Sequence, residues 1–130
     1  TLFERLRKVK GKKAVVIDAC LSGTFLEYLK SQHQNRPLTN YVLIASTTKE
    51  GISLSASWNV PNGSPLEGRT ISNVAYWLHT DGNTHKRINL ADIPIQKFEA
   101  SEEFLQTLPE EIRSRINLQI QRVSDTDFIL

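Results

Sequence analysis

Two short stretches of the chain consist of consecutive apolar and β-branched residues with no alternation of polar residues. The first spans 13–19 and centres on 14–17, and the second spans 41–46. A continuous run of this kind is typical of a strand that is buried on both faces, as in a parallel sheet covered by helices. The pattern therefore predicts two buried parallel strands.

Helical spacing precedes each of these strands. In 1–10 the apolar residues recur three or four positions apart, and Gly11 follows them as a helix-terminating residue. A capping box at Thr24 predicts a second helix that continues to about His33. Residues 1–46 are therefore expected to form helix, strand, helix and strand, a βαβ unit with a right-handed crossover.

The rest of the chain is less regular. Residues 47–68 are rich in Ser, Gly, Pro and Asn, and such an aperiodic stretch inside a compact domain is more typical of a functional loop than of a linker. Helical spacing returns over 70–79, Asn89 and Ser101 are expected to cap short helices, and 127–130 is expected to form a final strand. The expected organisation is one domain with three parts, 1–46, 47–68 and 69–130.

The composition is that of a globular domain. The 130 residues include 16 Lys+Arg and 14 Asp+Glu, a net charge of +2, with 39% hydrophobic and 23% charged residues, which excludes a disordered polar tail. No apolar run approaches the about 20 residues that cross a bilayer, and no signal peptide is visible, so we expect no membrane association and a cytoplasmic location. The single cysteine excludes an internal disulfide and a Cys-only zinc site. No metal-ligand spacing is present, and no cofactor is expected.

That cysteine, Cys20, follows the first predicted strand, where ligands bind in open α/β sheets. The positive end of the next helix favours a thiolate there, and such help or a nearby His is needed because an ordinary thiol is only a few per cent ionised at pH 7. Ser22 and Gly23 are expected to form a tight turn whose backbone N–H groups approach a bound carbonyl, as in an oxyanion hole. A buried, unreactive cysteine is the alternative interpretation.

Residues 16–23, Val-Ile-Asp-Ala-Cys-Leu-Ser-Gly, resemble the nucleophile motif of caspase-like cysteine peptidases, the group that contains metacaspases, legumains and gingipains. Residues 41–50 resemble the next strand of that family and its specificity loop, and 67–90 and 117–130 resemble its later elements less specifically. The resemblance implies an α/β fold with three layers, α/β/α, and a mostly parallel sheet whose N-terminal strands are not in this chain. It also implies a cysteine endopeptidase with Cys20 as the nucleophile.

The resemblance also implies substrate-binding residues. In metacaspase-like members the acidic residue two before the cysteine, here Asp18, pairs with Arg or Lys at P1, and residues two apart on a strand point to the same side. Ser46 resembles the small polar residue on the opposite wall of the same pocket. Trp58, in the long loop, is a candidate apolar wall for neighbouring substrate positions. The alternatives are local capping by Asp18 and Ser46 and core packing of Trp58.

One departure from the family concerns the general base. The family pairs its cysteine with a preceding histidine, whereas His33, His79 and His85 all follow Cys20. We therefore expect the histidine to come from another segment or chain. The expected partner is the N-terminal half of the same peptidase, separated by autoprocessing, and the expected substrate is a protein or peptide with Arg or Lys at P1.

Other functions are also compatible with the sequence. A catalytically inactive caspase-like module would bind a peptide or scaffold a partner, and a His-Gly pair upstream would distinguish the enzyme from it. The basic residues in 5–13 are compatible with nucleic acid, but the small net charge favours an exposed helix face, so no nucleic-acid partner is expected. A receiver-like signalling domain would use Asp18 but lacks the second acidic residue and the lysine that such a site needs.

Overall fold

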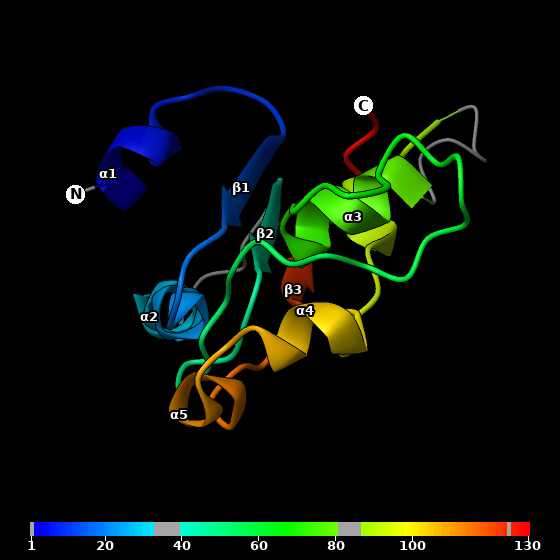
Figure 1. Ribbon diagram of the computed structural model, residues 1–130. Helices are drawn as coiled ribbons and strands as arrows, with labels where there is room; N and C mark the ends of the chain where they lie inside the picture. The colour runs from blue at the N-terminus through cyan, green and yellow to red at the C-terminus, as the bar shows by residue number, and fades with distance from the viewer. Residues whose placement is uncertain (1, 33–39, 81–86, 125) are drawn as a thin grey trace.

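The computed structural model describes residues 2–32, 40–80, 87–124 and 126–130. The first elements are α1 (Leu2–Arg7), β1 (Lys13–Ile17), α2 (Ser22–Gln32) and β2 (Tyr41–Ala45), which confirms the predicted order of helix, strand, helix and strand (Figure 1). The later elements are α3 (Asn73–Thr80), the 3₁₀ helix η1 (Leu90–Asp92), α4 (Glu102–Gln106), α5 (Glu110–Arg113) and β3 (Gln121–Ser124).

The three strands of the described ranges form one mixed sheet in the order β1-β2-β3. β1 and β2 are parallel, in register from Lys13 opposite Tyr41 to Ile17 opposite Ala45. β2 and β3 are antiparallel. The class is therefore α/β, and the predicted parallel pair is confirmed.

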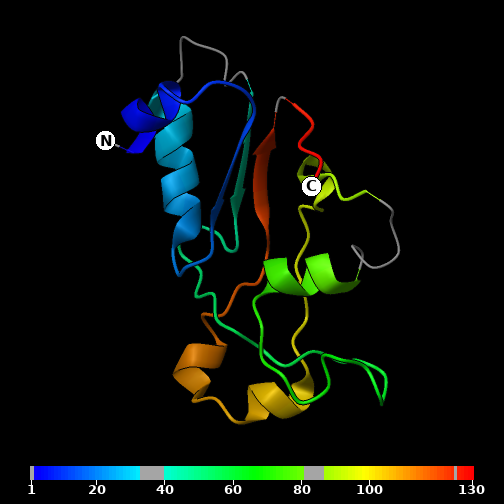
Figure 2. The ribbon, with the colours of Figure 1, turned by 90° about the horizontal axis from the view of Figure 1, so that it is seen from above.

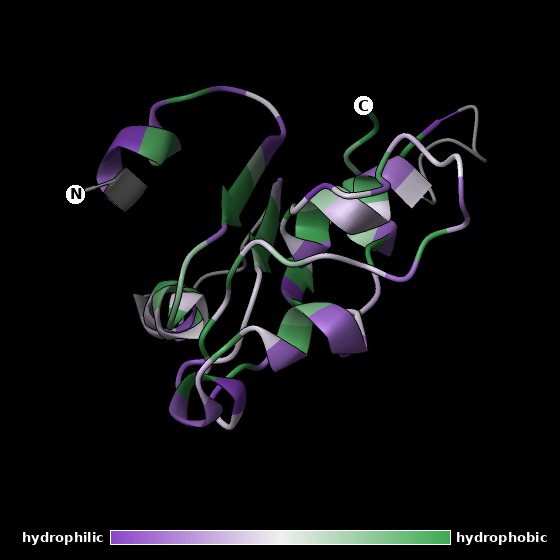
Figure 3. Ribbon diagram, viewed as in Figure 1, coloured by the Kyte–Doolittle hydropathy of each residue, from purple (hydrophilic) through white to green (hydrophobic). Residues whose placement is uncertain are grey.

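β2 lies at the centre of the fold because both of its faces are covered. Val42 and Ile44 belong to the larger core, which includes Val74 and Trp77 of α3. The alternate residues Tyr41, Leu43 and Ala45 belong to a smaller core with Leu26 and Leu29 of α2. Since successive strand residues point to opposite faces, α2 and α3 cover opposite sides of the sheet (Figure 2). In Figure 3 the ribbon of β2 has the green colour of hydrophobic residues.

β1 departs from the prediction of a strand buried on both faces. Its residues are partly exposed, and the side chain of Val16 is 42% exposed. β1 is an edge strand, and the larger core reaches Ala14 but not Val16. An apolar run in sequence thus predicts the strand but not how completely its neighbours cover it.

Some predicted helix ends are shifted. α2 begins at Ser22, two residues before the expected cap at Thr24, and the Thr24 hydroxyl donates to the Lys49 carbonyl oxygen at 3.2 Å instead of capping the helix. The helix expected over 70–79 begins at Asn73, and its first turn is capped by the hydroxyl of Ser72. The caps at Asn89 and Ser101 are confirmed: the two side chains accept hydrogen bonds from Ala91 N–H and Phe104 N–H.

The predicted final strand over 127–130 is wrong. The third strand of the sheet is Gln121–Ser124, whose mainly polar sequence gives no apolar signal. The C-terminal residues pair instead with 88–90 through the Asn89–Ile129 bridge. None of the helices in the described ranges is long and apolar enough to cross a membrane.

Candidate functional site

The turn that links β1 to α2, residues 18–24, carries the candidate nucleophile, and we call it the cysteine turn. Cys20 lies three residues beyond the end of β1 and two before the start of α2, as the sequence predicts. Its thiol is free and exposed. The alternative of a buried cysteine is therefore wrong, and the sulfur is open to solvent at the carboxyl end of a parallel strand.

The cysteine turn is held by residues 47–53, which we call the clamp segment. The Sγ of Cys20 donates to the carbonyl oxygen of Ser53 at 3.1 Å, and the Leu21 N–H donates to the carbonyl oxygen of Gly51 at 3.0 Å. These two contacts join residues more than 25 positions apart in the sequence. They fix the backbone of the turn at the sulfur and at the residue after it.

The clamp segment continues along the first turn of α2. The Thr47 N–H donates to the hydroxyl of Ser22 at 3.2 Å, and the Thr24 hydroxyl donates to the Lys49 carbonyl oxygen at 3.2 Å. Gly23 fits between these contacts: a Cβ atom there would lie 2.5 Å from the backbone nitrogen of Lys49. Only glycine allows so close an approach of two backbones.

The sequence predicts an oxyanion hole from the turn of Ser22 and Gly23, and the Cys20 N–H is a further candidate donor. The Ser22 N–H already donates to the Ala19 carbonyl oxygen at 3.3 Å. In the described part of the chain no residue accepts a hydrogen bond from the backbone N–H of Gly23 or Cys20. Gly23 lies in the first turn of α2, where N–H groups lack partners within the helix and point toward its N-terminal end, so the Gly23 N–H is available to an oxygen of a bound molecule. Cys20 lies two residues before the helix.

Leu21 has a strained backbone at the position directly after the cysteine. Its φ is 60°, in the left-handed region that a leucine occupies at a cost of about 1–2 kcal/mol. Its side chain is 48% exposed, so burial does not explain the conformation. The hydrogen bond from Leu21 N–H to Gly51 holds it there. Such strain clusters at functional sites.

Asp18, the candidate P1-binding residue, is exposed and directly follows β1. It lies two positions before Cys20, and both residues are open to solvent at the same end of the sheet. This arrangement leaves its carboxylate available to a cationic ligand.

Ser46 lies beside this site, but its side chain is enclosed. Its N–H donates to the Ile17 carbonyl oxygen at 3.1 Å, and its carbonyl accepts from the Asn73 amide at 2.8 Å. The side chain is 0% exposed, and its hydroxyl has no hydrogen-bond partner among the described residues. A substrate bound at Cys20 would therefore not reach the Ser46 side chain in this conformation.

Trp58 belongs to the larger core instead of a substrate wall. It is 7% exposed, its ring stacks on Tyr76 with centroids 4.6 Å apart, and Phe98 packs edge-on to it at 6.3 Å. Its indole N–H donates to the Ile71 carbonyl oxygen at 3.1 Å. The interpretation of Trp58 as a core residue is therefore the correct one for this structure.

Among the described residues, no histidine lies where it could act as a general base for Cys20. His79 is on the last turn of α3, which packs against the opposite face of the sheet from α2. His33 and His85 lie outside the described residues. The described ranges also contain no group of three or more His, Cys, Asp or Glu placed to hold a metal ion.

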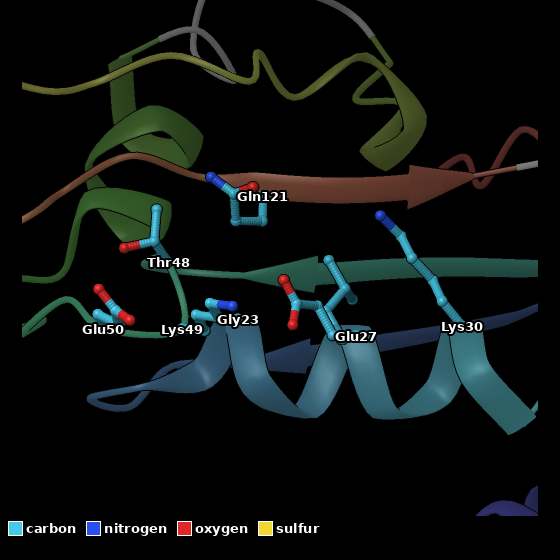
Figure 4. A pocket seen from close by; sticks show the side chains of 8 residues that line it. Gly23, Glu27, Lys30, Thr48, Lys49, Glu50 and Gln121 are labelled. Carbon is cyan, nitrogen blue, oxygen red and sulfur yellow. The ribbon is translucent and has the colours of Figure 1, made fainter.

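A cavity of about 310 Å³ lies next to the clamp segment. α2 contributes Glu27 and Lys30 to it, and the clamp segment contributes Lys49 together with its neighbour Glu50 (Figure 4). Opposite charges alternate around its rim, so it offers no strong preference for a cation or an anion. Neither Asp18 nor Cys20 lines it.

Sequence reasoning missed four residues that build the site: Gly51, Ser53, Asn73 and Asn117. Gly51 and Ser53 contact the cysteine turn through backbone carbonyls, which carry no side-chain signal. The Asn73 amide donates to the carbonyls of Ser46 and Leu118 at 2.8 and 2.9 Å, a buried polar role within a helix that otherwise reads as apolar. For Gly51 and Ser53 the available signal is the polar character of 47–68.

In the comparisons with known proteins, no family model, curated protein or solved structure matches this chain. The chemistry of the site is therefore inferred from its own residues.

Proposed function

We propose that this chain carries the nucleophile of a cysteine endopeptidase with a caspase-like fold, which cleaves protein or peptide substrates after Arg or Lys. The observation that carries the proposal is the exposed, free thiol of Cys20 on a firmly held turn at the carboxyl end of a parallel strand. Ligands of open α/β sheets bind at this edge. A cysteine with a purely structural role is usually buried among apolar side chains, whereas Cys20 is not.

The proposed reaction has two steps. The Cys20 thiolate attacks the scissile carbonyl carbon, the C–N bond breaks, the amine leaves with a proton, and a thioester remains. Water then attacks the thioester, releases the carboxylic acid and returns a proton to the sulfur. Because the thiol donates to the Ser53 carbonyl oxygen at 3.1 Å, it must break that hydrogen bond and give its proton to a general base before attack.

The N–H groups of Cys20 and Gly23 are the proposed donors to the oxyanion of each tetrahedral intermediate. Donors of this kind stabilise the developing charge most when they are already fixed in place. The contacts of Leu21 and Gly23 with the clamp segment supply that rigidity.

Asp18 is the proposed determinant of P1 specificity. Its exposed carboxylate, two residues from Cys20, matches a guanidinium or ammonium group, and a carboxylate binds a guanidinium through two parallel hydrogen bonds. Ser46 and Trp58 have no part in the proposed recognition, because both side chains are buried.

The proposed general base is a histidine from another segment or chain, such as the N-terminal half of the same peptidase. The outer edge of β1 supports this part of the proposal. Among the described residues β1 pairs with β2 on one side only, so its other edge is open to a further strand, and the side chain of Val16 is 42% exposed. A strand added there would cover Val16 and bring its own following residues to the carboxyl end of the sheet.

The proposal is tested by labelling the chain with two chloromethylketones that differ only in carrying an arginyl or a leucyl residue. We expect one adduct per chain, mapped to Cys20 by peptide mass spectrometry and absent in Cys20→Ser. The arginyl reagent should react about tenfold faster than the leucyl one, and Asp18→Asn should remove most of that advantage. The matched control is Asp92→Asn, which changes an exposed aspartate on η1. This variant should retain the faster reaction with the arginyl reagent. Equal rates for the two reagents, or an unchanged ratio in Asp18→Asn, would refute the specificity.

The second candidate function is a catalytically inactive caspase-like module that binds a peptide or a partner. The contact between the thiol and the Ser53 carbonyl favours it, since that bond uses the sulfur as a donor. Under this function the two reagents label Cys20 at equal rates, and peptide binding survives Cys20→Ser.

A further inference from the structure

We propose that Asn117 is a positioning residue for Cys20 and that it acts through the clamp segment. The inference rests on the proposed function, because it takes the Cys20 sulfur as the group whose placement matters. It adds a residue nearly 100 positions away from the cysteine, in a part of the chain without any catalytic signal in its sequence.

Asn117 holds the clamp segment through hydrogen bonds to three of its residues, Thr47, Thr48 and Ile52. Its side-chain amide donates to the Thr48 hydroxyl at 3.3 Å, and its backbone carbonyl accepts from the Thr47 hydroxyl. Its backbone N–H donates to the Ile52 carbonyl oxygen at 3.1 Å. Its Oδ1 accepts from the Gln119 N–H at 3.2 Å, which fixes the amide in the orientation that reaches Thr48.

The path from Asn117 to the sulfur is short. Ile52, which accepts from the Asn117 N–H, lies between Gly51 and Ser53. The carbonyls of those two neighbours accept from Leu21 N–H and from the Cys20 thiol. A shift of Ile52 therefore moves both supports of the cysteine.

Gly51 leaves little freedom for such a shift. A Cβ atom at Gly51 would overlap the Thr47 hydroxyl and would lie 2.9 Å from the Cβ of Asn117. The backbone of Gly51 is thus packed directly between the Asn117 side chain and the cysteine turn. Interiors packed this closely transmit small displacements instead of absorbing them.

Asn89 is the matched control, because it is another partly buried asparagine whose side chain joins distant segments. Its Oδ1 accepts from Ala91 N–H and Phe128 N–H, both at 3.0 Å, and its amide donates to Asp127 at 3.0 Å. None of these partners belongs to the cysteine turn or to the clamp segment. A loss of stability alone should therefore appear in Asn89→Ala as well as in Asn117→Ala.

The experiment compares Asn117→Ala, Asn117→Asp and Asn89→Ala in the full chain, with three readouts. These are the hydrogen exchange of the Leu21 amide, the rate of Cys20 alkylation by iodoacetamide, and the ratio of the arginyl to leucyl chloromethylketone rates. In Asn117→Ala we expect faster exchange at Leu21 and about fivefold faster alkylation, the change for one typical hydrogen bond lost at the sulfur, with a lower reagent ratio. Asn117→Asp keeps the oxygen that accepts from the Gln119 N–H. Its values for the three readouts should therefore lie between those of Asn117→Ala and those of the unaltered chain.

Asn89→Ala should lower the melting temperature while leaving the three readouts unchanged. Equal changes in Asn89→Ala and Asn117→Ala, or unaltered Leu21 exchange and alkylation in Asn117→Ala, would overturn the positioning role. If Asn117→Ala does not fold, Asn117→Asp decides the same question. A failure of the proposed function has a different signature: the unaltered chain then shows no preference for the arginyl reagent, whereas exchange and alkylation still report on Asn117.

Discussion

The two ends of the sheet both rely on asparagine side chains to join distant segments, but they differ in which type of residue carries a left-handed backbone. At the carboxyl ends of β1 and β2, Asn73 and Asn117 hold residues 46–53 beneath the cysteine turn. At the opposite end, Asn89 joins η1 to the C-terminal residues. Figure 2 shows the C-terminus at one end of the sheet and α4 with α5 toward the other.

Both ends of the sheet hold a non-glycine residue with a left-handed backbone, but the residue types differ. Asn40, directly before β2 at the opposite end, has a φ of 68°, and asparagine adopts this conformation more readily than leucine does. At the end that carries the cysteine, Leu21 has a φ of 60°, and the hydroxyls of Ser46 and Ser53 are buried with no hydrogen-bond partner among the described residues. The rest of the opposite end consists of an ordinary helix cap and a short backbone pairing. Local strain and unsatisfied polar groups lower stability, so an end that keeps them is expected to serve another purpose. This contrast is an independent reason to look for function at Cys20.

Of the substitutions that test this comparison, Asn73→Ala is expected to change the free energy of unfolding the most. The substitution leaves the carbonyls of Ser46 and Leu118 buried without their donor, and Asn73 itself is 0% exposed. We expect a loss of about 3 kcal/mol in the free energy of unfolding, measured by urea denaturation. Asn89→Ala, which removes a cap at the other end, should cost about 1 kcal/mol. Equal losses at the two ends would contradict the contrast.

Gly23→Ala is expected to lower the free energy of unfolding by less than Asn73→Ala does. The new methyl group would lie 2.5 Å from Lys49 N and 2.6 Å from the carbonyl carbon of Thr48, both backbone atoms that cannot rotate away. Overpacking of this kind costs about 2 kcal/mol, partly offset by the better helix propensity of Ala. Urea denaturation combined with Cys20 alkylation should show lower stability and an altered thiol rate. A net gain in stability would mean that the clamp segment is not held against Gly23.

Leu21→Gly is expected to have the smallest effect on stability, and it should stabilise the protein, whereas the other substitutions destabilise it. Glycine adopts a φ of 60° without steric cost, and the leucine side chain is 48% exposed, so little packing is lost. We expect a gain of about 1 kcal/mol in thermal denaturation. A loss of stability would show that the leucine side chain, and not its backbone, governs this position.

The sequence predicts the parts of the fold that depend on local pattern. β1 and β2 follow from apolar runs, and the caps at Asn89 and Ser101 from residue type at a helix start. β3 escapes prediction because it is a polar strand at the sheet edge, and the exposure of Val16 depends on neighbours that no local pattern reveals.

The candidate site divides in the same way. Cys20 and Asp18 are predictable because a turn after a parallel strand is a known ligand position. The clamp segment is not, since it contacts the cysteine turn mainly through backbone atoms and packing at glycines. Ser46 directly follows β2 as predicted, but the packing of Asn73 against it encloses its side chain. A pattern in sequence locates such a residue without determining whether it faces solvent.

The most direct test of the account is a crystal structure of the chain after reaction with the arginyl chloromethylketone. The account predicts a covalent bond from Cys20 Sγ to the inhibitor and a guanidinium paired with the carboxylate of Asp18. It would be contradicted by an adduct whose guanidinium points into solvent or pairs with Glu50 while Asp18 stays unoccupied.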